Sequence, residues 1–371
     1  MEVTFPAMRG RMGGREYFAT IMTLSEIPRF FKFTDWEQFS PELRAQRVLN
    51  ESRVPVIAKY IVDNEASYLF SSITASYTAS TINFVPMSED RPDVGQIKLD
   101  LEEMEFVIND GQHRCAAITQ ALKENPQLAK DRISVLLFPT ENMDRMQQMF
   151  SDLNRFAQRS SKSLNILYDH RDNLAALTNV VVERVDVFRG LVDMERVSIP
   201  IRSEKLFALS TIYDANKELL GNKIDPAGSG PYQATCDRAV EYWSTLADIV
   251  LDWKKVSKGL VAAAAVRQEK ISTHATVLRA LGGVGRILSE HHPTQWRERL
   301  QRLSAVDWRK SVGGKVNSLW DGVCISAGSV VANRQARLAT LETLCHQVGV
   351  SQEDIPGKRR RGRPRKTDGR D

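Results

Sequence analysis

Residues 105–122, EFVINDGQHRCAAITQAL, decide how the first part of this chain is expected to fold. Residues 106–108 are apolar and favour extended backbone, so residues 105–108 are expected to form a short buried strand. Asn109, Asp110 and Gly111 then form a turn signal. The apolar spacing of residues 115–122 predicts a helix. The stretch therefore predicts a strand, a tight glycine turn and a helix in immediate succession.

This succession suits the binding of a phosphate group. A helix N-terminus offers unpaired N–H groups and a partial positive charge, and Gly111 permits close backbone approach and a positive φ. Arg114 can make a two-pronged contact to phosphate, and His113 can donate a hydrogen bond or transfer a proton near neutral pH. Asp110 can cap the helix or hold a metal-bound water. The same residues also suit a plain turn before a solvated helix, and spacing alone leaves both interpretations open.

The rest of the first 165 residues mixes strand and helix patterns. Strands are expected at residues 17–24, within 68–84 and at 133–138, and residues 88–96 are expected to form a polar loop. After residue 165 helical periodicity dominates, as in Val240, Trp243, Ala247 and Val250. The predicted fold class is α+β, with a mixed domain at 1–165, an all-helical domain at 166–350 and a disordered basic tail at 351–371.

Composition sets limits on the class of protein. The chain has 371 residues, of which 42% are hydrophobic and 26% charged, as in ordinary globular proteins with room for about two domains. We find neither a signal-peptide pattern nor an apolar run long enough to span a membrane, and we expect a cytoplasmic protein. The cysteines lack zinc-site or disulfide-framework spacing, and they are Cys115, Cys236, Cys324 and Cys345.

The pentapeptide carries a family resemblance. Asp110 to Arg114 reads DGQHR, the signature that gives the DGQHR-domain proteins their name. Residues 105–122 and 150–164 (FSDLNRFAQRSSKSL) closely resemble the DndB family of the bacterial DNA phosphorothioation, or DNA sulfur modification, system. The resemblance covers the first 165 residues. It implies a DNA-binding transcriptional repressor of the modification genes, with operator DNA and other phosphorothioation proteins as partners.

The same segment also resembles the ParB and sulfiredoxin group of folds. Gly111, Arg114 and Ala117 fit the G-x-x-R-x-x-A pattern of ParB-type proteins, and Gly111, His113 and Arg114 fit a sulfiredoxin element. Gln112 replaces the sulfiredoxin cysteine, so sulfinic acid repair is not expected. The resemblance implies a ParB/sulfiredoxin-like domain that binds a nucleoside triphosphate, ATP or CTP. The implied nucleotide- or phosphate-binding residues are Asp110, Gly111, Gln112, His113, Arg114, Asn154, Arg155 and Lys162.

Positive charge is concentrated at the C-terminus. The formal net charge is +5, and residues 357–371 contribute +6, which leaves −1 for the other residues. Arg361-Gly362-Arg363-Pro364 looks like an AT-hook, because arginine enters the narrow A·T minor groove and glycine lets the backbone follow it. A nonspecific polyanion-binding tail is the alternative. The expected DNA-binding residues are Lys358, Arg359, Arg360, Arg361, Gly362, Arg363, Pro364, Arg365 and Lys366.

These observations predict a repressor that binds double-stranded, A·T-rich operator DNA and acts in the cytoplasm at the nucleoid. The alternative is a nucleotide hydrolase or nuclease-like accessory enzyme, but no catalytic residue stands out. A scaffold for other modification proteins is a third hypothesis, and a homo-oligomer is compatible with all three. Residues 281–285 (LGGVG) are expected to mark close helix packing or a break in the helix. Trp296, Trp308 and Trp320 are expected in the core, with a stacking platform for single strands as the alternative.

Overall fold

The computed structural model describes residues 2–31, 51–78, 82–100, 105–140, 143–155, 160–221 and 224–355. It divides the chain into two compact units, residues 1–158 and 159–371. Each unit has its own cluster of buried apolar side chains. The first unit holds a mixed sheet with helices and the second is mainly helical, so the predicted α+β class is confirmed.

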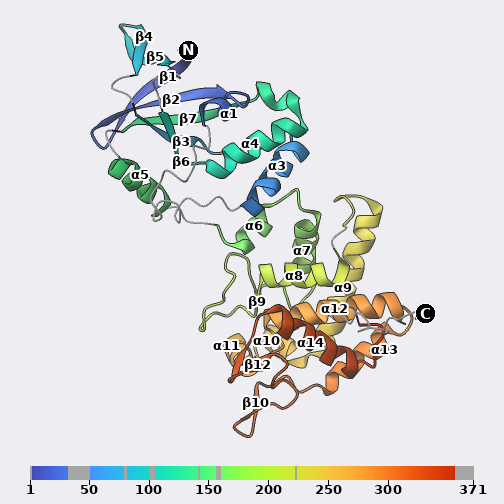
Figure 1. Cartoon of the computed structure of the whole chain (residues 1–371). Coiled ribbons are helices and arrows are strands. Elements are labelled where there is room, and N and C mark those ends of the chain that lie inside the picture. The colour runs from blue at the N-terminus through green and yellow to red at the C-terminus, as the bar shows by residue number, and fades with distance from the viewer. Residues whose placement is uncertain are drawn as a thin grey trace, which may run out of the picture. The chain divides into compact units, whose positions relative to one another are not determined.

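The first unit is built on a seven-stranded sheet, whose strands run in the order β4-β5-β1-β2-β7-β3-β6 (Figure 1). Strands β3 and β7 pair in parallel, and all other neighbours pair antiparallel. The parallel pair places β3 between β7 and β6, next to the start of the pentapeptide. The strands are β1 (Glu2–Met12), β2 (Arg15–Thr23), β3 (Ile73–Thr78), β4 (Asn83–Ser88), β5 (Arg91–Asp100), β6 (Glu105–Asp110) and β7 (Arg132–Pro139).

Two longer helices, α3 and α4, pack against each other beside this sheet (Figure 1). Helix α4 buries Cys115, Ala117, Ile118 and Ala121, an i, i+3 stripe of the kind that seats a helix on an apolar core. Burial raises the pKa of the Cys115 thiol to about 12, so this cysteine is protonated and unreactive at neutral pH. The helical segments are α1 (Ile27–Phe30), η2 (Glu51–Arg53), α3 (Val54–Asp63), α4 (Gln112–Glu124), η3 (Pro126–Lys130) and α5 (Met143–Arg155).

Two strands of the sheet differ from the sequence expectation. Residues 88–96 were expected as a polar loop, but β5 includes residues 91–96, and the Arg- and Gly-rich start of the chain forms β1. Both strands bury few side chains: Phe5 and Ala7 lie in the core on β1, and Ile97 and Leu99 on β5. On β1 the alternation is obscured, because Met8 and Met12 are exposed and Arg9 lies on the same face as Phe5 and Ala7. The Arg9 guanidinium lies 4.9 Å from the Phe84 ring centre.

In the second unit, α12 packs against α8 and α14. The all-helical expectation needs a small correction, because three two-stranded pairs of two residues each also occur here. They are β8 (Val192–Asp193) with β9 (Phe207–Ala208), β10 (Ser311–Val312) with β11 (Lys315–Val316), and β12 (Ile325–Ser326) with β13 (Ser329–Val330). The helical segments are α6 (Lys162–Tyr168), α7 (Asn173–Arg184), α8 (Leu209–Leu220), α9 (Gly230–Ile249), α10 (Leu251–Ser257), α11 (Ala263–Glu269), α12 (Ala275–His291), α13 (Trp296–Gln301), η4 (Arg302–Ala305) and α14 (Arg334–Gln347).

Tryptophans form much of the second core. Trp243, Trp253 and Trp320 are fully buried, and Trp308 stacks on Trp320 with 5.7 Å between ring centroids. The Trp320 indole N–H donates to the Asp307 carbonyl oxygen at 2.8 Å, which satisfies the polar end of the ring. Trp308 and Trp320 are therefore core residues, as expected, whereas Trp296 is only partly buried and packs against the edge of this core. Among the residues described, no helix has the length and apolar character of a membrane span.

Glycines set the distance between α8 and α12. Gly282, Gly283 and Gly285 lie in the middle of α12 and are buried. A Cβ atom at Gly282 would collide with the carbonyl oxygen of Ala215 on α8. A Cβ atom at Gly285 would lie 2.5 Å from a methyl carbon of Leu219. The expectation that residues 281–285 mark close helix packing is confirmed.

We expect Gly282→Ala to destabilise the helical unit. Alanine gains about 1 kcal/mol of helix propensity, but overpacking against a backbone atom costs about 1–3 kcal/mol or more, because backbone moves less readily than a side chain. The matched control is Gly283→Ala, whose Cβ would meet only the Leu341 Cδ1 methyl at 2.9 Å. In thermal and denaturant unfolding, the Gly282→Ala protein should be clearly less stable than the Gly283→Ala protein. Equal stabilities would contradict the packing argument.

Candidate functional site

The pentapeptide forms the strand, turn and helix that the sequence predicts. Strand β6 ends at Asp110 and α4 begins at Gln112, with Gly111 between them at φ +108°. This backbone conformation strongly favours glycine. A Cβ at Gly111 would also lie 3.2 Å from Ile73 Cγ1 and 3.4 Å from Arg114 Cζ. The glycine is therefore required both by its dihedral angle and by the neighbours that close around it.

The Arg114 guanidinium makes hydrogen bonds to several groups of the first unit. Nη2 lies 2.6 Å from Asp110 Oδ2, and Nη1 donates to the Ser72 carbonyl oxygen at 2.8 Å and to Ser71 Oγ at 2.6 Å. Nη1 also donates to the Ser71 carbonyl oxygen. The side chain is 14% exposed. Arg114 thus ties the segment that enters β3 to the turn that leaves β6, which sequence spacing did not indicate.

The charge at the start of α4 is divided between opposing groups. The first helical hydrogen bond runs from the Cys115 amide to the Gly111 carbonyl oxygen at 2.9 Å, so the amides of residues 112–114 have no acceptor within the helix. The Asp110 carboxylate, 48% exposed, lies beside this end and pairs with Arg114. It stabilises the helix dipole, and it would repel an approaching phosphate unless another cation contributes.

Arg53 is such a cation, and sequence reasoning gave it no role at the site. It ends η2, directly before α3, which packs against α4. Burial lowers the pKa of His113 from its ordinary value of 6.5, and the charge of Arg53 lowers it further, against an opposing effect of Asp110. His113 is therefore mainly neutral at pH 7. Because the unfolded chain binds this proton more readily, the contribution of His113 to stability is lost as the pH falls below 6.5.

Behind the turn lies a buried polar pair. The Asn109 side-chain amide donates to Ser76 Oγ on the neighbouring strand β3, and both side chains are fully buried. Asn109 Oδ1 has no hydrogen-bond partner within the described structure. An unsatisfied buried amide oxygen costs about 1–3 kcal/mol, so this pair fixes the position of β6 at some cost in stability.

The other predicted nucleotide residues are not all part of this cluster. Gln112 is half-buried in the first turn of α4. Asn154 and Arg155 end α5, and their side chains lie outside the described part of the structure. Lys162 belongs to the second unit, where its Nζ lies 2.6 Å from Asp214 Oδ1. The predicted DNA-binding residues 358–366 lie outside the described residues.

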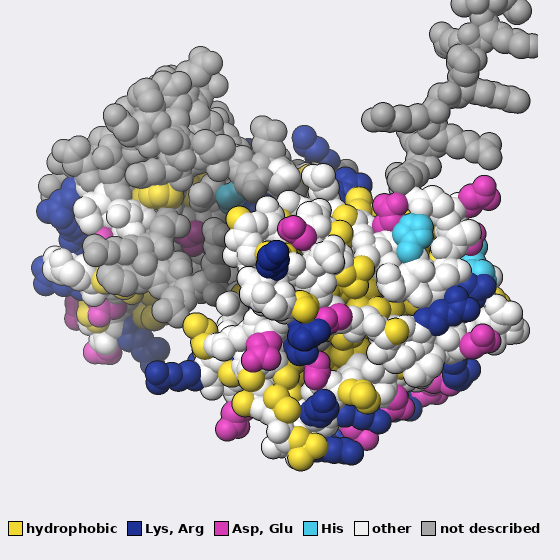
Figure 2. All heavy atoms as spheres, turned by 90° about the horizontal axis from the view of Figure 1, so that it is seen from below, with side chains coloured by type: hydrophobic (Ala, Val, Ile, Leu, Met, Phe, Trp, Pro, Cys, Tyr) yellow, Lys and Arg dark blue, Asp and Glu magenta, His cyan; other side chains and the backbone are white. Residues whose placement is uncertain are grey.

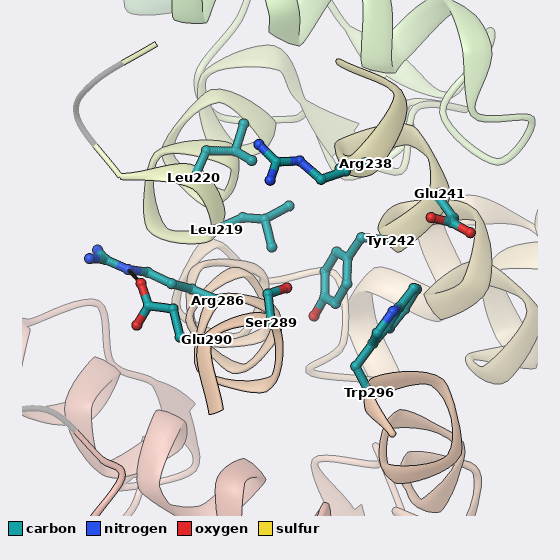
Figure 3. A pocket seen from close by; sticks show the side chains of 9 residues that line it. All are labelled: Leu219, Leu220, Arg238, Glu241, Tyr242, Arg286, Ser289, Glu290 and Trp296. Atoms are coloured by element: carbon teal, nitrogen blue, oxygen red, sulfur yellow. Dashed lines mark hydrogen bonds and ion pairs between the residues drawn. The ribbon is translucent and has the colours of Figure 1, made fainter. Parts of the chain in front are cut away.

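The helical unit contains a separate cavity of about 260 Å³ between α8, α9, α12 and α13 (Figure 3). Leu219, Leu220, Tyr242 and Trp296 give it an apolar interior, and Arg238, Glu241, Arg286 and Glu290 stand at its edge. Both glutamates are paired with arginines, Glu290 with Arg286 at 2.8 Å and Glu241 with Arg297. The Tyr242 hydroxyl donates to the Leu281 carbonyl oxygen. The cavity therefore combines apolar and polar walls, and its two glutamates are paired, whereas Arg238 donates to Thr235 Oγ1 at 3.1 Å.

One protein family matches nearly the whole chain. The family model DndB, described as DNA-sulfur modification-associated, matches residues 5–351. The chain belongs to the DndB family. The match extends through the helical unit, well beyond the first 165 residues on which the sequence resemblance rests, so both units of the chain are parts of the DndB family pattern. No similar protein was found among curated sequences, and no similar fold among solved structures.

We expect Arg114→Ala to lower the free energy of unfolding of this DndB family member by about 2–3 kcal/mol, because it removes charge-assisted hydrogen bonds from a nearly buried site. Arg114→Lys should recover only part of the loss, since one ammonium group cannot reproduce two guanidinium positions. Lys123→Ala, an exposed change on the same helix, is the control. Denaturant unfolding measures all three. If Arg114→Ala unfolds like Lys123→Ala, the guanidinium does not hold the turn.

Proposed function

We propose that this chain is a DNA-binding transcriptional repressor of a DNA phosphorothioation gene cluster, acting in the cytoplasm at the nucleoid. Its family membership ties it to DNA sulfur modification. The observation that favours direct DNA binding is the basic sequence at residues 358–366, KRRRGRPRK. A Gly-Arg-Pro core between basic residues suits insertion into a narrow A·T minor groove.

The charge distribution favours different roles for the basic tail and the folded units in DNA binding. On the face shown in Figure 2, lysine and arginine side chains are interspersed with aspartate and glutamate. Residues 357–371 carry a net +6, against −1 for the rest of the chain. The general attraction to DNA would therefore come from the tail, because phosphate contacts dominate nonspecific affinity. Recognition of an operator would then require contacts from the folded units.

We further propose that the start of α4 binds a phosphate group of a nucleotide such as ATP or CTP. The amides of residues 112–114, which precede the first hydrogen bond of the helix, and the cation Arg53 support this role. Arg114 would act as a positioning residue, because its guanidinium already holds Ser71, Ser72 and Asp110. A nucleotide hydrolase is the weaker alternative, since the Asp110 carboxylate is paired with Arg114 and is poorly placed to serve as a general base.

Gel-shift titration with promoter DNA of the modification genes tests the repressor proposal. We expect the full-length protein to bind this DNA at least tenfold more tightly than a scrambled duplex of equal length and A·T content, at matched salt. Equal affinity for the two duplexes would exclude operator recognition and leave only nonspecific binding.

The tail makes a second, separable prediction. Truncation after Glu353 should weaken DNA binding and flatten the dependence of log affinity on log salt, because fewer counterions are released. The double change Gly362→Ala and Pro364→Ala keeps every charge and serves as the matched control. It should keep the salt slope and lose preference for A·T-rich over G·C-rich duplexes. An unchanged preference would identify the tail as a nonspecific basic segment.

A further inference from the structure

Helices α12 and α14 begin at the same cavity in the helical unit. The cavity has a volume of about 260 Å³ and is lined by Ala275, Thr276 and Arg279 of α12 and by Asn333, Arg334 and Arg337 at the start of α14. The two helices have 17 and 14 residues and pack against each other. Their positive N-terminal ends therefore lie side by side, an arrangement that is electrostatically unfavourable unless negative charge is nearby.

The first turn of α12 lacks the usual cap. His274, at the N-cap position, accepts no hydrogen bond from the helix with its side chain. The Thr276 hydroxyl donates to the Val331 carbonyl oxygen at 3.0 Å, which ties α12 to the segment that leads into α14. On α14, the Asn333 side chain caps the Ala336 amide at 2.8 Å. The cavity wall thus includes the start of a helix that no side chain caps.

Arginines outnumber the carboxylates that reach this cavity. Glu218 of α8 accepts from Arg279 Nη2 at 2.9 Å and also from Arg337 Nη1. Asp214 lies 3.9 Å from Arg279 Nη1 but is shared with Lys162, 2.6 Å away. Glu218 therefore orients two guanidinium groups without neutralising both.

Two donors at the cavity remain without a partner within the described structure. Arg279 Nε is shielded from solvent and makes no hydrogen bond, although the Arg279 side chain as a whole is 35% exposed. The exposed side chain of Arg334 makes no hydrogen bond or ion pair in the part of the chain that the structure describes. The unpaired charge of Arg334 adds to that of Arg279 and Arg337, and an anion between these three side chains would offset the excess of positive charge.

We propose that this cavity binds a phosphate group, carried by a nucleotide or by the backbone of a nucleic acid. Fixed guanidinium forks match the tetrahedral oxygens of phosphate, and helix amides add further donors. Glu218 is the anchor that holds Arg279 and Arg337 in place, while Arg334 closes the site from the exposed side. This site uses residues of the helical unit alone and is independent of the pentapeptide and the tail.

Calorimetry on the full-length protein tests the site with three probes: inorganic phosphate, dAMP, and a short DNA duplex without terminal phosphates. The test variant is Arg334→Glu, which reverses a charge at an exposed position without breaking a described contact. Arg202→Glu, an exposed arginine change in the same unit, is the matched control. We expect Arg334→Glu to weaken at least one probe tenfold or more, and Arg202→Glu to leave it nearly unchanged.

The pattern of losses identifies the source of the phosphate. Loss of dAMP and phosphate binding indicates a free nucleotide, whereas a selective loss of duplex affinity indicates the DNA backbone. Arg53→Ala, on the other unit, separates this cavity from the proposed phosphate site at α4, because it should not affect a probe bound at Arg334. The proposal is overturned if Arg334→Glu and Arg202→Glu bind all three probes equally, or if the wild-type protein binds none of them.

Discussion

The Arg114 guanidinium joins two parts of the first unit that are far apart in sequence. It contacts Ser71 and Ser72 just before β3 and Asp110 at the end of β6. Strands β3 and β6 are neighbours in the sheet, and α4 starts one residue after Asp110. A single charged group therefore fixes the geometry of the turn on which the signature pentapeptide depends. Charge-assisted hydrogen bonds at a nearly buried position are strong enough for this purpose.

These contacts give Gly111 and Arg114 of the pentapeptide a structural role that the sequence did not indicate. In the sequence, Gly111 and Arg114 suggest two direct phosphate ligands. In the structure, Gly111 makes room for the Arg114 guanidinium, and Arg114 is already engaged with protein atoms. The motif residues build the turn, and the Arg114 guanidinium is engaged within it. Motif residues can thus determine a site mainly by shaping it.

The strand-turn-helix at residues 105–122 and the helical character of the second unit were predictable, because both follow from local periodicity and turn chemistry. Strands β1 and β5 were not, because few of their side chains are buried and their exposed side chains include apolar as well as charged ones. Two of the partners of Arg114, Ser71 and Ser72, lie more than forty residues away, and nothing local indicates them. The ParB-type resemblance implied Lys162 as a nucleotide ligand, and only the tertiary structure shows its Nζ 2.6 Å from Asp214 Oδ1.

The glycines of α12 have a consequence for how the helical unit opens. At Gly282 the backbones of α8 and α12 are in close contact, and at Gly285 the Leu219 side chain packs directly on the helix, so few side chains between α8 and α12 could rearrange to admit water. Separating α8 from α12 would break the whole contact between the two helices at once, at a high cost in free energy. We therefore expect this contact to open only when the whole unit unfolds. The amides at the centre of α12 should accordingly be among the slowest to exchange with solvent deuterium. The arginine-lined cavity lies at the N-terminal end of α12, so its residues would be held by a helix that stays folded until the whole unit unfolds.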